Sequence, residues 1–279
     1  MASTPYPDLV DYHVHHERCG HAVEPMERYV QSALAKGLGE MGLSDHLYCY
    51  WPAPLVQPGD VGMPEERYDE YVTEARALQR AYPQIRLRLA MEVDYIAGYE
   101  EQLAKILGQY EWDYLLGSVH FLGDWNFDHA RYIDEYDRRD IDEVYLQFWD
   151  LLGQAAETGL FDVMTHIDLP KKFGFRPKSD LRSAKQRMVE RLARAGVAVE
   201  VNTSGLRKPA REIYPALDLL TICREAGVPA TLSSDSHHPD EVGCDFDKAL
   251  EHLERAGYHE YSAFEGRRRE MRPLPRMRA

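Results

Sequence analysis

VDYHVH, residues 10 to 15, begins like a buried strand and ends in two histidines. Side chains of a β-strand repeat every two residues, so His13 and His15 are predicted to leave one strand face together and to bind a single ion. His21 follows after a short loop and could reach an adjacent ion from the rim. A polar strand end with solvated histidines is the alternative for this stretch taken alone.

Composition indicates a soluble globular protein. The chain has 279 residues, of which 44% are hydrophobic and 29% charged, and this length suits a single barrel-type domain over residues 1–279. No apolar run approaches the roughly 20 residues that a membrane-spanning helix needs. The first five residues lack the charged and apolar regions of a secretory signal, so a cytoplasmic location is expected, with no membrane partner.

Cysteines and net charge exclude further classes. The four cysteines form no CxxC pair, which argues against a thiolate zinc knuckle and a disulfide framework. The net charge of −14 would repel a phosphate backbone, so no nucleic-acid partner is expected. The basic stretch from about residue 267 is predicted to be a short solvated tail. Whether the chain forms a homo-oligomer is left open.

Strand-like and helix-like segments alternate along the chain. Strands are predicted at residues 10–15, 40–45, 86–93, 114–120, 161–166, 197–202 and 229–235, with a short closing strand possible at 258–264. Helices are predicted at about 24–36, 65–82, 99–107, 140–158, 180–195 with Ser179 as its cap, 215–226 and 245–256. This alternation is typical of a parallel α/β architecture.

Potential metal ligands gather at the carboxyl ends of the predicted strands. They are His13, His15, His46, Glu92, His120, His166 and Asp235. In a doubly wound sheet the strand ends do not all converge, whereas in a barrel they form one functional rim. The pattern therefore favours a distorted (β/α)7 TIM-like barrel.

The ligand types indicate a cluster of ions. Histidine and carboxylate without thiolate suit zinc, iron or manganese, and Glu92 could bridge two ions. With His21 and His237 the candidates number nine, too many for one ion, so two or three divalent transition-metal ions are expected. Ions about 3.5–4 Å apart typically activate a water and neutralise phosphoryl oxygens. Hydrolysis of a phosphate ester is the predicted reaction.

Short motifs along nearly the whole chain carry a family resemblance. They are His13-Val14-His15, Cys19-Gly20-His21, Asp45-His46, Glu92, Gly117-Ser118-Val119-His120, Thr165-His166-Ile167-Asp168, Glu200-Val201-Asn202-Thr203 and Ser234-Asp235-Ser236-His237. In this order they resemble the polymerase and histidinol phosphatase (PHP) superfamily. KKFG at 171–174, NTSGLRKP at 202–209 and IYP at 213–215 resemble its histidinol-phosphate phosphatase branch.

The resemblance implies a (β/α)7 barrel with a trinuclear site and groups the ligands. His13, His15, Glu92 and Asp235 would hold one ion. Glu92, His120 and His166 would hold the second, and His21, His46 and His237 the third. Asp235, His237 and Arg207 are then the candidate catalytic residues.

Candidate substrate contacts lie in the loops above the predicted rim. Arg207 follows the sixth strand, and its planar guanidinium suits bidentate phosphate binding. Lys172 and Arg176, after the fifth strand, are weaker candidates for the same role. His129 is a candidate acid or substrate contact, and Trp51 belongs to a proline-rich loop at 47–64 that is predicted to cover the site. For each of them an exposed loop residue is the alternative.

The resemblance implies a metal-dependent phosphomonoesterase that hydrolyses L-histidinol phosphate in histidine biosynthesis. Another PHP phosphoesterase, acting on a different small phosphomonoester, a nucleotide or phosphotyrosine, is the first alternative. An amidohydrolase-type deaminase would need a mid-chain lysine where this chain has Glu92 or His120. A noncatalytic metal-binding domain would not require open coordination positions.

Overall fold

The computed structural model describes residues 9–47, 50–52 and 62–275. Seven strands form one parallel sheet in the order β1-β2-β3-β4-β7-β8-β9. Their bounds are β1 (Val10–Asp11), β2 (Glu40–Leu43), β3 (Arg86–Asp94), β4 (Tyr114–Ser118), β7 (Val163–Met164), β8 (Ala198–Asn202) and β9 (Ala230–Ser233). The prediction of a parallel α/β fold with seven strands is confirmed.

The sheet curls until its first and last strands meet. The amide of Tyr12 donates to the carbonyl of Leu232 at 3.2 Å, and that of His15 donates to the carbonyl of Ser236 at 2.9 Å. These bonds join the chain around β1 to the end of β9, so the sheet is a distorted barrel. The predicted TIM-like barrel is therefore confirmed, and all seven strand ends face one rim.

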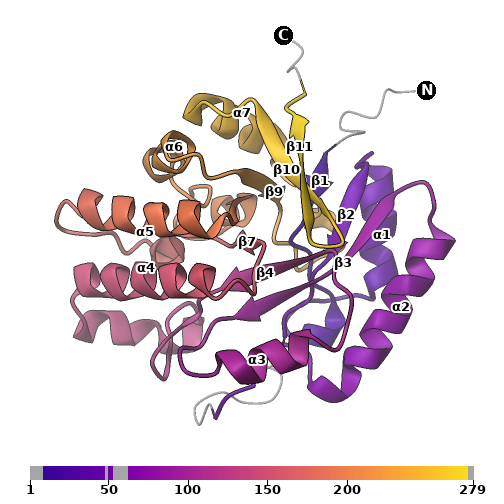
Figure 1. The fold of residues 1–279 in the computed structure, drawn as a ribbon, viewed down its shortest axis with the longest axis horizontal. Coiled ribbons are helices and arrows are strands. Elements are labelled where there is room, and N and C mark those ends of the chain that lie inside the picture. Colours follow the sequence, from indigo (N-terminus) through magenta and orange to yellow (C-terminus); the bar gives the residue numbers. More distant parts are fainter. Residues whose placement is uncertain (1–8, 48–49, 53–61, 276–279) are drawn as a thin grey trace.

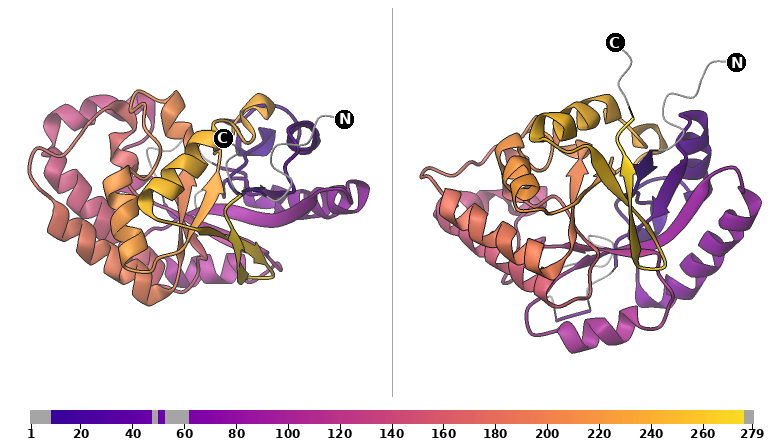
Figure 2. Two further views of the ribbon diagram at one scale, coloured as in Figure 1. Left: turned by 90° about the horizontal axis from the view of Figure 1, so that it is seen from above. Right: turned by 45° about the horizontal axis from the view of Figure 1, so that its top comes forward.

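Helices follow the strands and lie outside the sheet (Figures 1 and 2). Their bounds are α1 (Met26–Ala35), α2 (Tyr68–Ala81), α3 (Glu100–Leu107), α4 (Ile141–Glu157), α5 (Arg182–Ala195), α6 (Leu217–Glu225) and α7 (Phe246–Ala256). In α1 the buried residues Met26, Tyr29, Val30 and Ala33 share one face, as in an amphipathic helix that packs on a core. Ser179 does not cap α5, because its hydroxyl donates to Asp142.

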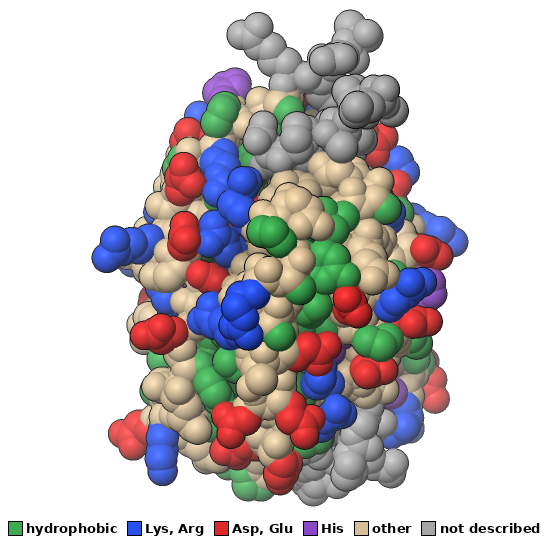
Figure 3. Space-filling view, turned by 90° about the vertical axis from the view of Figure 1, so that its right-hand side faces the viewer, with side chains coloured by type: hydrophobic (Ala, Val, Ile, Leu, Met, Phe, Trp, Pro, Cys, Tyr) green, Lys and Arg blue, Asp and Glu red, His purple; other side chains and the backbone are tan. Residues whose placement is uncertain are grey.

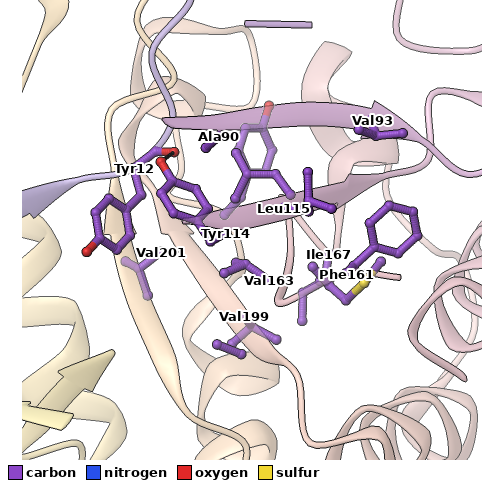
Figure 4. Packing of buried hydrophobic residues seen from close by; sticks show 14 of the residues in the cluster. Tyr12, Ala90, Val93, Tyr114, Leu115, Phe161, Val163, Ile167, Val199 and Val201 are labelled. Carbon is purple, nitrogen blue, oxygen red and sulfur yellow. Dashed lines mark hydrogen bonds between the residues drawn. The ribbon is translucent and has the colours of Figure 1, made fainter. Parts of the chain in front are cut away.

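Buried side chains from several strands form one continuous core. Figure 4 shows residues of β3, β4, β7 and β8 meeting there, among them Tyr114, Val163 and Val201. Strands β2, β4, β8 and β9 are buried along their whole length, as expected for parallel strands that are covered on both faces. The barrel therefore holds its rim on a rigid base.

The basic stretch near the C-terminus differs from its prediction. β10 (Glu260–Glu265) and β11 (Arg268–Pro273) form an antiparallel hairpin, so the segment from residue 267 to 273 is not a solvated tail. Nor does β10 close the sheet as the sequence suggested, because its ladder partner is β11. RREMRP shows no regular alternation of charged and apolar residues, so its strand conformation depends on pairing with β10.

Polar groups attach this hairpin to the opposite end of the barrel. Glu40 is fully buried and accepts from Tyr12 at 2.5 Å, from Arg88 Nε at 2.7 Å and from Arg272 Nη1 at 2.7 Å. Arg272 belongs to β11, whereas Glu40 begins β2. The hairpin is therefore held by a buried ionic cluster.

Charged side chains of both signs are spread over the face in Figure 3, between smaller patches of hydrophobic surface. Among the described residues, Val23 is the single large hydrophobic side chain classed as exposed. No helix within the described ranges is long and apolar enough to cross a membrane.

Candidate metal centre

The predicted ligands converge at the carboxyl ends of the strands. His13 and His15 follow β1, His46 follows β2, Glu92 lies within β3 and His120 follows β4. His166 follows β7, and Asp235 with His237 follows β9. Most of these side chains are buried, whereas His21 is exposed and His237 is 30% exposed. The structure thus brings together the nine candidate ligands that the sequence indicated.

The two oxygens of Glu92 face different ligand sets. Oε2 lies 3.3 Å from His13 Nε2 and 3.4 Å from His15 Nε2. Asp235 Oδ1 completes this set at 3.4 Å from His15 Nε2 and 3.8 Å from His13 Nε2. Both histidines therefore do leave one face together, and a single ion among these four side chains would have four ligands.

The second oxygen of Glu92 faces another pair of histidines. Oε1 lies 3.6 Å from His120 Nε2 and 3.4 Å from His166 Nε2, and these two nitrogens are 3.3 Å apart. A carboxylate with one oxygen in each of two histidine sets has the geometry of a bridging ligand. The bridging role predicted for Glu92 is compatible with this arrangement.

The third predicted group is looser. The ring centroids of His21 and His237 lie 5.0 Å apart, and those of His21 and His46 lie 6.0 Å apart. His46 Nδ1 lies 3.7 Å from Glu92 Oε2. The potential ligand atoms of His46, Glu92 and His120 all lie within 4.8 Å of one another. The potential ligand atoms of His21, His15 and Cys19 likewise lie within 4.8 Å of one another. The third ion position is thus less sharply defined than the other two.

Buried carboxylates orient the ligand histidines, and the sequence reasoning missed them. Asp94 accepts from His46 Nε2 at 3.0 Å and from His120 Nδ1 at 2.9 Å. Glu200 accepts from His13 Nδ1 at 2.6 Å. Such bonds fix which ring nitrogen remains to bind a metal. Asp94 could have been found, because it lies two residues beyond Glu92 on the same strand face.

Electrostatics match a cation site. Burial favours the neutral form of His13, but the carboxylates of Glu200 and Glu92 raise its pKa well above the usual range. Burial likewise opposes ionisation of Glu92, yet His46 and His13 hold its pKa well below the usual range. A divalent cation among these groups would supply the charge compensation that imidazolium otherwise gives, and it would release protons on binding.

Unsatisfied nitrogens test whether the residues fit such an ion. His13 Nε2 is buried and has no hydrogen-bond partner among the described residues, while His13 Nδ1 is held by Glu200. The free nitrogen is the one that faces Glu92 and Asp235. This is the arrangement of a metal-ligating histidine, so the donor set fits.

Two ligands have a strained backbone. His166 has φ 23° and Asp235 has φ 48°, both in the left-handed region that side chains other than glycine rarely adopt. Such strain concentrates at functional sites, where the surrounding structure holds it. For Asp235, Asn202 Nδ2 and Ser204 Oγ donate to Oδ2 at 3.1 and 3.0 Å and leave Oδ1 toward the histidines.

A cavity of about 340 Å³ opens above the ligands. Beside eight of the nine candidate ligands, all except His13, its walls contain Asn126, Asp128, His129, Ala130, Leu169, Lys172, Ser204, Lys208 and Tyr214. Lys172 and His129 thus lie where the sequence predicted. Lys208, Asn126, Asp128 and Tyr214 were missed, since nothing local distinguishes them from other loop residues.

Three predicted substrate contacts do not line the cavity. Arg207 Nη2 donates to the carbonyl of Ser234 at 2.7 Å, and Nε lies 3.3 Å from Glu241. Arg176 pairs with Glu212 at 2.5 Å. Trp51 packs edge-on against Phe121, with ring centroids 5.1 Å apart. Most of the predicted lid, residues 48–49 and 53–61, lies outside the described residues.

Two further histidines, His16 and His252, are buried outside the candidate site. His16 Nδ1 lies 3.2 Å from Asp45 Oδ2, and its ring stacks on Tyr71. His252 Nε2 bonds to the carbonyl of Pro215 at 2.9 Å. Neither is among the cavity-lining residues, so both have structural partners in place of solvent.

The fold and the site define a (β/α) barrel protein with a histidine and carboxylate centre for divalent metal ions at its strand ends. A model of the PHP domain family matches residues 11–204 of the chain. The chain therefore belongs to the PHP domain family.

The chain is similar to named relatives over most of its length. A Deinococcus radiodurans protein named "Probable histidinol-phosphatase" is 38% identical over 89% of this chain and 94% of its own. The histidinol-phosphatase of Bacillus subtilis is 27% identical over 86% of this chain and 98% of its own. A crystal structure of histidinol phosphate phosphatase from Lactococcus lactis, complexed with zinc, L-histidinol and phosphate, has a TM-score of 0.77 at 21% identity, over 94% of this chain and 99% of that one.

Proposed function

We propose that the protein is a metal-dependent phosphomonoesterase that hydrolyses L-histidinol phosphate to L-histidinol and phosphate in histidine biosynthesis. The observation that carries the proposal is Glu92, whose two oxygens face separate histidine sets at the floor of the cavity. Names of relatives at up to 38% identity support the substrate.

Two or three divalent ions such as zinc, iron or manganese would activate water and neutralise the phosphoryl oxygens. His13, His15, Glu92 and Asp235 would hold one ion, and Glu92, His120 and His166 a second. His21, His46 and His237 would hold a third.

The chain's own cationic groups would hold the substrate's phosphate. Lys172 and Lys208 both line the cavity, from the loops after β7 and β8. Lys172 is 20% exposed and tied to Asp128, so little side-chain freedom remains to be lost on binding. Arg207 would act indirectly, since it holds the carbonyl of Ser234 beside the ligand Asp235.

The small-molecule substrate accords with the size and charge of the protein. A net charge of −14 disfavours a nucleic-acid partner, and we infer a cytoplasmic enzyme whose residues 1–279 act as one domain. The same acidic balance suits a substrate with a cationic amine and imidazole.

Turnover of L-histidinol phosphate by purified protein tests the function. Phosphate release should require divalent ions, disappear with chelator and return on adding zinc or manganese. A panel with other phosphomonoesters, a nucleotide and phosphotyrosine separates the alternatives within the family. Failure on every ester, in protein with bound metal, would contradict the proposal.

A further inference from the structure

Part of the cavity wall is formed by β6 of the β5–β6 hairpin and the turn that follows it. β5 (Phe121–Leu122) pairs with β6 (Trp125–Asn126), and the amide of Phe127 donates to the carbonyl of His120 at 3.1 Å. This bond fixes the segment beside a metal-ligand candidate.

Along residues 125 to 128, side chains that pack in the core alternate with side chains that line the cavity. Trp125 and Phe127 are buried in the core, where Phe127 packs edge-on against Phe148 with centroids 5.5 Å apart. Asn126 and Asp128, the residues between and after them, line the cavity. The aromatic pair thus aims two oxygen-bearing side chains at the space above the metal centre.

Both side chains have capacity to accept hydrogen bonds. Asn126 is 5% exposed, and its Oδ1 has no hydrogen-bond partner among the described residues. Lys172 Nζ binds Asp128 Oδ2 at 2.8 Å and the Asp128 carbonyl at 2.7 Å. These two bonds use Oδ2 and the main-chain carbonyl of Asp128, not Oδ1. Lys172 and nearby His120 keep the pKa of Asp128 below its usual range despite burial, so it presents a carboxylate.

We propose that Asp128 and Asn126 form the subsite for the protonated amine of the substrate, which rests on the proposed function and deepens it. In L-histidinol phosphate the amine is on the carbon next to the one that bears the ester. A phosphate at the metal centre therefore puts the ammonium group within the same cavity. Asp128 Oδ1 pairs with this cation, and Asn126 Oδ1 accepts a second N–H.

One competing role must be separated, because Asp128 could act only by positioning Lys172 against the phosphate. Two substrates distinguish these roles, L-histidinol phosphate and 3-(imidazol-4-yl)propyl phosphate, which lacks the amine. Amine recognition affects one substrate, whereas phosphate positioning affects both.

The experiment compares kcat/KM for both esters in the wild type, Asp128→Asn and Asp124→Asn. Asp124 is an exposed aspartate in the turn between β5 and β6 and is absent from the cavity lining, so it controls for lost charge. Asp128→Asn should lower kcat/KM about 10- to 100-fold for the amine-bearing ester. The same substitution should lower kcat/KM for the amine-free ester less than threefold. The control Asp124→Asn should leave kcat/KM for both esters unchanged.

Product inhibition gives a second measurement. Asp128→Asn should weaken inhibition by L-histidinol about tenfold and leave inhibition by inorganic phosphate unchanged. Asn126→Ala should also weaken inhibition by L-histidinol, but by a smaller factor. This variant still tests the subsite if Asp128→Asn fails to fold.

Equal losses of kcat/KM for both esters, with weaker inhibition by phosphate, would show that Asp128 only positions Lys172. That result would overturn the amine subsite. A wild type that hydrolyses both esters equally well would also overturn it, while the proposed phosphatase would stand. A wild type that hydrolyses neither would contradict the proposed function itself.

Discussion

Glu92 is the residue on which the two well-defined ligand sets depend. Its oxygens lie 3.3 to 3.6 Å from nitrogens of His13, His15, His120 and His166. A peripheral ligand such as His21 contacts none of these carboxylate oxygens closely and is exposed. Loss of the two side chains should therefore have different consequences.

Glu92→Gln should lose more than one ion per chain, because the amide keeps the shape but not the charge shared by two sites. His21→Ala should lose at most one ion and retain part of the activity. Elemental analysis together with turnover of p-nitrophenyl phosphate checks both variants. Equal metal content in the two proteins would contradict the bridging role.

Asp94 controls two ligand histidines at once, through bonds to His46 Nε2 and His120 Nδ1. Asp94→Asn replaces one acceptor by an N–H donor, so one histidine must adopt the other tautomer or lose its bond. Zinc affinity should fall about 10- to 100-fold, measured by competition with a chromophoric chelator. Exposed Asp240→Asn serves as control, and unchanged affinity in Asp94→Asn would show that Asp94 does not orient these ligands.

At the scale of elements, the loops after β8 and β9 are tied together by Arg207. Its contacts to Ser234 and Glu241 reach the segment that bears Asp235 and His237, and the other carboxylate oxygen of Glu241 accepts from the His237 amide at 2.9 Å. Arg207 is thus placed to stiffen a ligand-bearing loop.

Arg207→Ala should then reduce metal retention, whereas Lys172→Ala and Lys208→Ala should keep the metals and lose turnover. Removing a charged phosphate contact should lower kcat/KM roughly ten- to a hundredfold. Metal content and kcat/KM for the three variants decide the matter. If Arg207→Ala keeps its metals and loses turnover, the arginine itself contacts phosphate as its residue type first suggested.

The β10–β11 hairpin depends on buried Glu40. Glu40→Gln leaves Arg88 and Arg272 without their carboxylate and should reduce the free energy of unfolding by about 3–5 kcal/mol at neutral pH. Glu265→Gln removes a partner of Arg88 that is 76% exposed, and it should cost less than about 1 kcal/mol. Urea unfolding curves measure both.

The effect of Glu40 should depend on pH. Hydrogen bonds from Tyr12, Arg86 and Arg88 outweigh burial and lower the pKa of Glu40 from its usual 4.5. A carboxyl with a depressed folded pKa stabilises above its unfolded pKa and loses this contribution as the pH falls through the folded value. The difference between wild type and Glu40→Gln should therefore shrink below about pH 4.5, and a constant difference would contradict the assignment.

At the scale of the whole molecule, metal binding should stabilise the folded state, because the ligands come from strands along the entire barrel. Purified protein should carry more than one transition-metal ion per chain. An ion at a thousandfold excess over its Kd adds about 4 kcal/mol, so chelation should lower Tm markedly as well as abolish turnover. Calorimetry with and without chelator tests this, and an unchanged Tm in fully stripped protein would contradict it.

The sequence by itself determined the barrel and most of its ligand set, because both depend on local periodicity. His13 and His15 share a face through the two-residue repeat of a strand, and the other ligands follow from their places at strand ends. Parallel strands point their carboxyl ends one way, so seven predicted strands already imply one rim.

Only the tertiary structure decided where long side chains point and which residues they bind. Arg207 lies in the predicted loop, but its Nη2 and Nε contact Ser234 and Glu241, which are distant in sequence. Asp128 meets Lys172 across 44 residues, and Arg272 meets Glu40 across 232. Such pairs follow from how the loops and the hairpin pack on the barrel, and neither residue type nor spacing along the chain encodes them locally.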